Sequence, residues 1–181
     1  MALISVIDDF EPLQDERLLK KAAALAPALH REKVSPASAF YLRERYSADR
    51  EPVPMEALPR MPWKKGENIC LDFGNHQVGY LTLWLGYEGS HPDAPAHIKL
   101  KFAENLKELS ENTSNYNGWV SGSWIQEEVL HVDVLPSVVK LPRRYAFRYL
   151  KITVLNTSPK YRLVIRRAEC ETVTSADDAL L

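Results

Sequence analysis

Residues 66–74, GENICLDFG, and residues 78–87, VGYLTLWLGY, carry the pattern that decides the fold class. In the first stretch Ile69, Leu71 and Phe73 alternate with other residue types, and in the second stretch Leu81, Leu83 and Leu85 do the same. Successive side chains of a strand point to opposite faces, so each stretch predicts a strand with one apolar face.

The same alternation recurs later in the chain. Further predicted strands are HIKLKFAEN (97–105), WIQEEVLHVDV (124–134), AFRYLKITVL (146–155) and YRLVIRRAEC (161–170). Short strands with turn-rich links and no long helix between them favour a mainly β fold, a jelly-roll-like antiparallel β-sandwich.

The chain before residue 65 has a different character. Residues 15–26 are rich in strong helix formers with apolar residues at helical spacing, and Pro27 then ends or kinks the predicted helix. Ser35 as N-cap, followed by Pro36 at the first helical position, predicts a second short helix that includes residues 40–42. We therefore expect a helical N-terminal arm before the sandwich.

The distribution of proline and glycine suggests the domain boundaries. Four of the twelve prolines fall within residues 48–62, which predicts an extended connector over the surface of the next domain, and all seven glycines follow residue 65. We expect a helical arm and connector over residues 1–65, a β-sandwich accessory domain over 66–175, and the start of a linker over 176–181.

Composition excludes several classes of protein. The chain has 181 residues, 45% of them apolar, and its 23 basic and 24 acidic residues nearly balance, so nucleic acid is not an expected partner. The sequence contains no run of eighteen apolar residues that would span a bilayer, so a membrane is not an expected partner either. Acidic residues interrupt the first ten residues before a signal-peptide region could form, so we expect a cytoplasmic protein.

The residues that commonly bind metals give no signal. Cys70 and Cys170 are the two cysteines, too few for a disulfide framework or a four-cysteine zinc site, and their positions in predicted strands indicate buried thiols. The five histidines show no metal-ligand spacing. We expect neither a metal nor a cofactor.

Glu104 and Arg148 form the first candidate constellation. Glu104 continues the alternation of the apolar residues of 97–105, and Arg148 continues that of Leu150 and Ile152. A charge on an apolar strand face requires a partner, which predicts that these two residues pair. The pair would be structural, tying two strands together, or it would face a ligand.

A cluster of aromatic residues lies in the stretch NYNGWVSGSW. Tyr116, Trp119 and Trp124 occur here around two glycines, in a loop without clear periodicity. Flat rings on loops suit sugars, whose C–H faces stack on them, and Asn115 and Asn117 would supply amides for the hydroxyls. The alternative is that at least one tryptophan closes an edge of the sandwich core.

Two other features have competing interpretations. The strand face opposite the leucines carries Tyr80, Thr82 and Trp84. These residues would form either a sugar platform or the surface on which the N-terminal helices dock, and we favour the docking surface. Nine basic residues and no acidic ones occur within 140–167, which suggests a surface for an acidic partner or a neighbouring domain.

No catalytic residue is predicted. Glycoside hydrolysis needs two carboxylates, but the adjacent Glu127 and Glu128 would point to opposite faces of a strand. Whether the chain is part of an enzyme is left open by these residues.

Four short motifs, in order and at plausible spacing, carry a resemblance. They are Asp72-Phe73-Gly74, Val78-Gly79-Tyr80, Ala103-Glu104-Asn105 and Phe147-Arg148-Tyr149. Over about residues 66–172 the chain resembles the β-sandwich region upstream of the catalytic domain in bacterial α-L-rhamnosidases and related sugar hydrolases. The family often has histidine before Ala-Glu, whereas Phe102 stands here, which argues against a polar ligand role for that strand end.

The resemblance implies an accessory role. In that family, acidic residues on a helical (α/α)6 barrel that follows the last strand carry out inverting glycoside hydrolysis. Here SADDALL ends the sequence where the barrel would begin, which implies a fragment or a free-standing relative without the active site. The expected partners are the catalytic (α/α)6 domain and rhamnose-containing glycans.

The function expected from the resemblance is therefore a non-catalytic sandwich module that supports the catalytic domain and contacts carbohydrate. Two alternatives stay open at this point. One is a free-standing carbohydrate-binding module, and the other is a protein-interaction scaffold that uses the basic strands.

Overall fold

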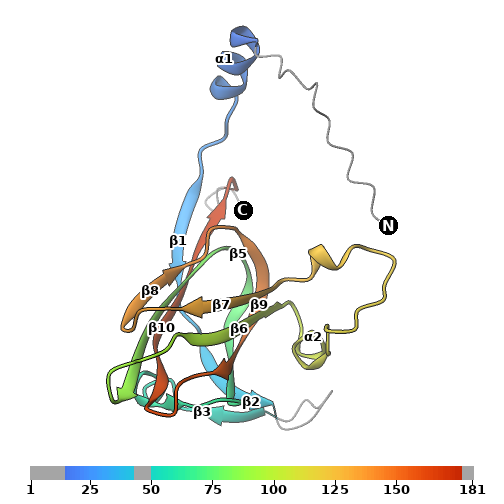
Figure 1. Ribbon diagram of the computed structural model, residues 1–181. Coiled ribbons are helices and arrows are strands. Elements are labelled where there is room, and N and C mark those ends of the chain that lie inside the picture. The colour runs from blue at the N-terminus through green and yellow to red at the C-terminus, as the bar shows by residue number, and fades with distance from the viewer. Residues whose placement is uncertain (1–14, 43–49, 177–181) are drawn as a thin grey trace, which may run out of the picture.

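The longest strand, β5 (Asn68–Gly89), organises the fold in the computed structural model, which describes residues 15–42 and 50–176. Its first half pairs with β9 (Tyr145–Asn156), and its second half pairs with β10 (Tyr161–Thr174). The register against β9 shifts between Asp72 and Gln77, where β5 passes from one layer to the other. Figure 1 shows the resulting two β layers.

The other elements are arranged around these three strands, all in antiparallel pairs. The remaining strands are β1 (His30–Val34), β2 (Ser38–Leu42), β3 (Arg50–Val53), β4 (Pro62–Trp63), β6 (Ala96–Ala103), β7 (Glu127–Val132) and β8 (Ser137–Lys140). The helices are α1 (Glu16–Ala24), α2 (Leu106–Ser110) and the 3₁₀ turns η1 (Leu58–Arg60) and η2 (Gly122–Trp124). The main path through the sheet is β1-β10-β5-β9-β6-β7.

The predicted apolar faces form the core, which confirms the antiparallel β-sandwich. The alternating residues of β5, β6 and β9 are buried between the two layers, as expected from their period. They are Ile69, Leu71, Phe73, Leu81, Leu83, Leu85, Ile98, Leu100, Phe102, Leu150, Ile152 and Val154. Phe102 lies flat against Tyr145, with ring centroids 3.9 Å apart, so this strand end is part of the core.

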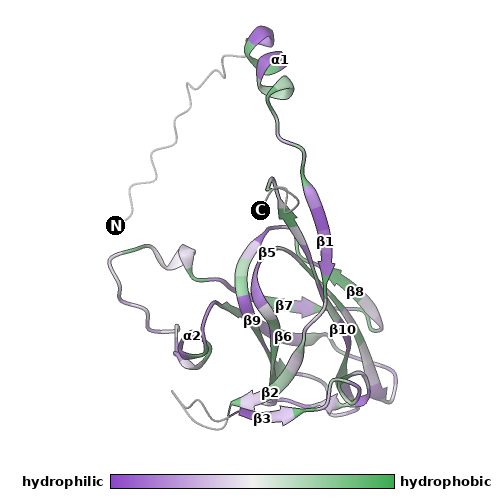
Figure 2. Ribbon diagram, turned by 180° about the vertical axis from the view of Figure 1, so that it is seen from behind, coloured by the Kyte–Doolittle hydropathy of each residue, from purple (hydrophilic) through white to green (hydrophobic). Residues whose placement is uncertain are grey.

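The short N-terminal helix is confirmed, and Asp15 caps its first turn. Asp15 accepts a hydrogen bond of 2.9 Å from the backbone N–H of Arg17, which satisfies one free donor of α1. The helix buries no side chain. Figures 1 and 2 both show it beyond the end of β1, away from the sandwich.

The predicted docking of the N-terminal helices on Tyr80, Thr82 and Trp84 is therefore wrong for α1. Trp84 is covered instead by a side chain of the neighbouring strand, since the guanidinium of Arg167 lies 4.8 Å from its ring centroid. Residues 82–85 of β5 pair with β8 along the edge of β5 opposite to the one that pairs with β10.

The second predicted helix is also wrong, because residues 38–42 form β2. Ser38 pairs with Asp72 of β5, and the side chains of Ala39 and Phe40 are buried. The Ser35–Pro36 signal is local, whereas pairing with β5 buries apolar side chains of this segment in the sandwich.

The described part of the predicted connector joins the sandwich. The strand β3 pairs with β2, and β4 pairs with β10. Val53, Leu58 and Trp63 are buried, so this segment contributes to the core rather than only crossing its surface. Residues 1–14, 43–49 and 177–181 of the predicted arm, connector and linker lie outside the described residues, and the proposed domain boundaries stay predictions.

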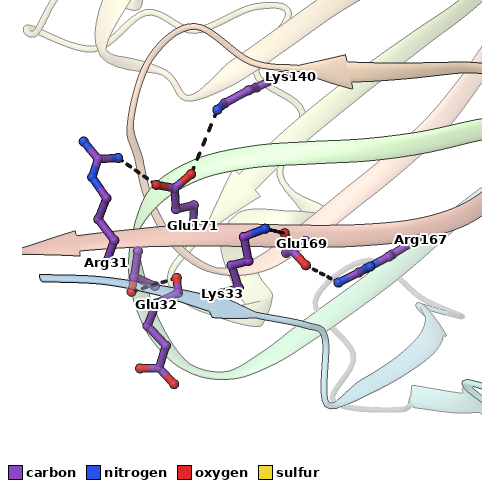
Figure 3. Close-up of polar contacts among 8 residues, drawn as sticks. Arg31, Glu32, Lys33, Lys140, Arg167, Glu169 and Glu171 are labelled. Atoms are coloured by element: carbon purple, nitrogen blue, oxygen red, sulfur yellow. Dashed lines mark hydrogen bonds and ion pairs between the residues drawn. The ribbon is translucent and has the colours of Figure 1, made fainter.

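Ion pairs attach the edge strand β1 to β10 (Figure 3). Arg31 lies 2.7 Å from one carboxylate oxygen of Glu171, and Lys140 of β8 lies 4.0 Å from the other oxygen. Lys33 lies 3.6 Å from the buried carboxylate of Glu169, whose other oxygen pairs with Arg167. Figure 2 shows the hydrophilic character of this edge strand, and charges of this kind discourage pairing with other chains.

Gly79 allows β5 and β10 to approach closely. A Cβ at this position would overlap the carbonyl oxygen of Glu171 and lie 2.7 Å from the sulfur of Cys170. Both atoms belong to a paired strand that cannot move aside without breaking its ladder.

We expect Gly79→Ala to lower the free energy of unfolding by about 2 kcal/mol, the usual cost of overpacking against fixed atoms. Urea denaturation measures the change. Gly122→Ala is the matched control, because its Cβ would meet its nearest neighbour at 3.9 Å and should change stability little. Equal stability of the two variants would contradict the close approach.

Candidate functional site

The aromatic loop, residues 111–126, connects α2 to β7 and contains the five residues predicted to contact sugar. Its rings are exposed: Trp119 by 98%, Trp124 by 77% and Tyr116 by 45%. Asn115 and Asn117 are exposed as well, and in the described structure their side chains make no hydrogen bond. Neither loop tryptophan closes the core, so the structural alternative for this cluster is wrong.

A buried charge cluster fixes both ends of the aromatic loop. The ammonium group of Lys101, on β6, donates to the carbonyl oxygen of Glu111 at 2.5 Å and lies 3.4 Å from a carboxylate oxygen of Glu127. Glu127 also accepts bonds from Lys99, at 3.1 Å, and from Thr113. The start of the loop and the residue that follows its end are thereby attached to the same strand.

The pKa values of this cluster follow from its burial and its charges. Burial lowers the pKa of Lys101, and the negative charge of Glu127 only partly opposes this effect. Burial also acts to raise the pKa of Glu127, but the bonds from Thr113 and Lys99 outweigh it and hold that pKa below its ordinary value. The carboxylate of Glu127 is therefore ionised at neutral pH.

Gly118 is in close contact with the ring of Tyr116 within the loop. A Cβ there would overlap the ring of Tyr116, so the absence of a side chain lets this ring fold across the backbone. Ser121 caps η2 by accepting a hydrogen bond of 3.2 Å from the N–H of Ser123. These contacts give shape to a segment without long secondary structure.

The end of the loop is joined to the start of β9 by one side chain. The amide of Gln126 donates to the carbonyl oxygen of Ala146 at 3.1 Å and accepts from its N–H at 2.9 Å. Trp124 and Arg144 each lie two residues before this contact, which brings them to the same groove.

The groove has a volume of about 520 Å³. It is lined by Val78, Ser123, Trp124, Gln126, Arg143, Arg144, Tyr145 and Ala146. Of the five predicted sugar-contact residues, only Trp124 lines it. Arg143 and Arg144 belong to the basic stretch 140–167 that was predicted as a surface for an acidic partner or a neighbouring domain, but their place beside Trp124 was not predicted.

The predicted pair of Glu104 and Arg148 does not form. Arg148 binds Asp72 through two hydrogen bonds of 2.9 and 3.0 Å, whereas Glu104 lies 3.3 Å from a ring nitrogen of His76. Two causes explain the error. The buried positions of β9 slip by one residue between Phe147 and Leu150, and β6 ends one residue before Glu104.

Asp72 has a structural role. Burial acts to raise its pKa, but the hydrogen bonds from Arg148 and from the N–H of Gly74, together with the charge of Arg50, hold the pKa below its ordinary value of 3.8. This carboxylate is therefore ionised at neutral pH and links β5, β9 and β3.

We expect Asp72→Asn to destabilise the fold by about 2 kcal/mol, because it breaks the ion pair between the buried carboxylate of Asp72 and the partly exposed guanidinium of Arg148. The folded-state pKa is depressed, so this stabilisation is complete above pH 3.8 and is lost as the pH falls through the lower folded value. Urea denaturation from pH 3 to 8 measures both effects.

Glu104→Gln is the matched control for this prediction. Its carboxylate is exposed, so its loss should change the free energy of unfolding by less than about 0.5 kcal/mol. A larger effect for Glu104→Gln than for Asp72→Asn would contradict the assignment of the structural pair.

We also expect Glu127→Gln to loosen the aromatic loop, because it removes the counter-charge of Lys101 and weakens the contacts with Lys99 and Thr113. Hydrogen exchange of residues 111–126 should become at least about tenfold faster, a change of about 1.4 kcal/mol in local opening. Glu111→Gln removes an exposed carboxylate of the same loop and should leave exchange unchanged. Unaltered exchange in Glu127→Gln would exclude this anchoring role.

Neither the thiols nor the carboxylate pairs suggest catalysis. Burial raises the pKa of Cys70 to about 12 and that of Cys170 to about 11, so both stay protonated. Glu128 accepts a hydrogen bond of 2.6 Å from the Tyr145 hydroxyl and pairs with Arg143, away from the partners of Glu127. In residues 15–42 and 50–176, no three His, Cys, Asp or Glu side chains are placed to hold a metal ion. No helix of this part is long and apolar enough to cross a membrane.

The comparisons with known proteins decide the family. Residues 41–172 match the family described as "Glycosyl hydrolase family 78 alpha-rhamnosidase N-terminal domain". The chain belongs to this family. The rhamnosidase from Klebsiella oxytoca, solved with rhamnose bound, is 41% identical with a TM-score of 0.81, over 90% of this chain and 33% of that chain.

More distant structures resemble it too. The GH78 rhamnosidase of Bacillus sp. GL1 is 16% identical over 71% of this chain and 13% of its own, with a TM-score of 0.46. The module CBM32-1 of a family 31 glycoside hydrolase from Clostridium perfringens is 13% identical over 76% of this chain and 96% of its own, with a TM-score of 0.42. A comparison with curated protein sequences found no match.

The resemblance to the α-L-rhamnosidase sandwich region is thus confirmed. This rhamnosidase N-terminal domain spans about a third of the length of the Klebsiella enzyme, which implies further domains in that enzyme.

Proposed function

We propose that this rhamnosidase N-terminal domain is an accessory module that holds a catalytic (α/α)6 domain and contacts rhamnose-containing glycans through its aromatic loop. One observation supports the sugar contact most directly. Among the described Phe, Tyr and Trp side chains, those that are exposed all lie in this loop: Tyr116, Trp119 and Trp124. Exposed rings beside free amides are the chemistry that sugar faces and hydroxyls need.

The supporting role rests on a second surface. Leu18, Leu19 and Leu25 of α1 and the segment after it are largely exposed, as is Leu29 before β1. An amphipathic helix that buries nothing on its own domain favours an interface with another part of the protein. The match covers only a third of the Klebsiella rhamnosidase, so we expect the partner of this helix to be the remaining part of the enzyme.

The sugar contact is tested by titrating the chain with a methyl α-L-rhamnoside and measuring affinity by calorimetry or NMR. We expect Trp119→Ala and Trp124→Ala to weaken binding by about tenfold each, since a stacked ring contributes about 1 kcal/mol beyond its buried area.

Val138→Ala is the matched control, because Val138 is an exposed apolar residue of β8 outside the loop. It should bind as the unaltered chain does. Full affinity in both tryptophan variants would remove the aromatic loop from the sugar contact.

A further inference from the structure

The groove beside Trp124 combines a flat ring with a positive charge. Trp124 forms one wall, Val78 and Tyr145 contribute apolar surface, and Arg144 brings a guanidinium group. Ser123 adds a hydroxyl, which accepts a hydrogen bond from Ser121 and keeps its own proton to donate. The groove thus combines a ring, a positive charge and a hydroxyl donor, and this combination selects a narrower class of ligand than the exposed rings and amides of the rest of the aromatic loop.

The two arginines of the groove differ in their partners. Arg143 lies 2.9 Å from a carboxylate oxygen of Glu128, and its guanidinium lies over the ring of Tyr145. Arg144 is exposed and has no carboxylate partner among the described residues. None of the residues that line the groove is acidic, so the charge of Arg144 is not compensated there.

Four of the nine basic residues within 140–167 have no carboxylate partner among the described residues, and of these four (Arg144, Lys151, Arg162 and Arg166) Arg144 is the one that lines the groove. Lys140, Arg143, Arg148, Lys160 and Arg167 each pair with a carboxylate. Arg144 is thus left available for an anionic group from outside the domain. A guanidinium matches the two oxygens of a carboxylate because its donors lie in one plane.

We propose that this groove binds a uronic acid unit of a glycan, with the C–H face of the sugar on Trp124 and its carboxylate on Arg144. The inference rests on the proposed function, because the aromatic loop must face carbohydrate for the groove to be used. It adds the chemical class of the ligand: an acidic sugar rather than a neutral one.

The structure explains how the ring and the charge keep their spacing. Gln126 and Ala146 are joined by two hydrogen bonds, and each lies two residues after one of the contact residues. Gln126 is therefore a positioning residue, which holds the end of the aromatic loop against the start of β9. It binds backbone groups and leaves the guanidinium of Arg144 free.

Two disaccharides that differ in one group test the inference: rhamnosyl-glucuronic acid and its carboxyl-reduced counterpart, rhamnosyl-glucose. Calorimetric titration of the chain at low salt should show at least about tenfold tighter binding of the acid, as for a charge-assisted contact. The preference should shrink at high salt, because exposed charges are screened.

Arg144→Gln should abolish the preference for the acid and retain the affinity for rhamnosyl-glucose. Arg162→Gln is the matched control, because it removes the same charge from an exposed position on β10, opposite Glu88 of β5. It should keep the preference, which separates a local contact from an effect of net charge.

Three results would overturn the inference. Equal binding of both disaccharides, or a preference that survives in Arg144→Gln, would exclude a carboxylate site at Arg144 while leaving the sugar contact of the aromatic loop intact. Absence of binding for both disaccharides would reject the groove and the proposed sugar contact together.

Discussion

The long strand β5 pairs with strands of both layers, and the rest of the structure depends on this constraint. One unbroken strand of 22 residues provides a partner for β9 in its first half and for β10 in its second half. The passage between layers lies where the register shifts, and Gly79 just after it removes the side chain that would separate β5 from β10. The core, the edge strands and the position of the groove all follow from this passage, since Val78 at its end lines the groove.

Much of the sandwich could be predicted because its strands obey a local period. The buried faces of β5, β6 and β9 follow from alternation, and the exposed aromatic loop follows from its glycines and lack of period. The strands before residue 65 could not be predicted in this way. The segment β2 begins next to a helix-start signal, and it becomes a strand because β5 offers a partner distant in sequence.

The candidate site was predicted only in part, for a similar reason. The aromatic rings could be recognised from residue type, but the availability of Arg144 depends on which carboxylates its neighbours occupy in space. The pairing of Arg148 with Asp72 likewise depends on a one-residue slip in β9 that no residue pattern announces. Charge partners across strands follow from register, and register is a property of the folded sheet.

The tryptophans fall into two groups with different roles, since Trp63 and Trp84 stabilise the sandwich whereas Trp119 and Trp124 are proposed to meet sugar. The four tryptophan indole N–H signals in a two-dimensional NMR spectrum test this division directly during titration with rhamnosyl-glucuronic acid. We predict that the Trp124 signal shifts most, that Trp119 shifts with it, and that the signals of Trp63 and Trp84 stay in place. Four unmoved signals, or equal shifts at all four, would contradict the division.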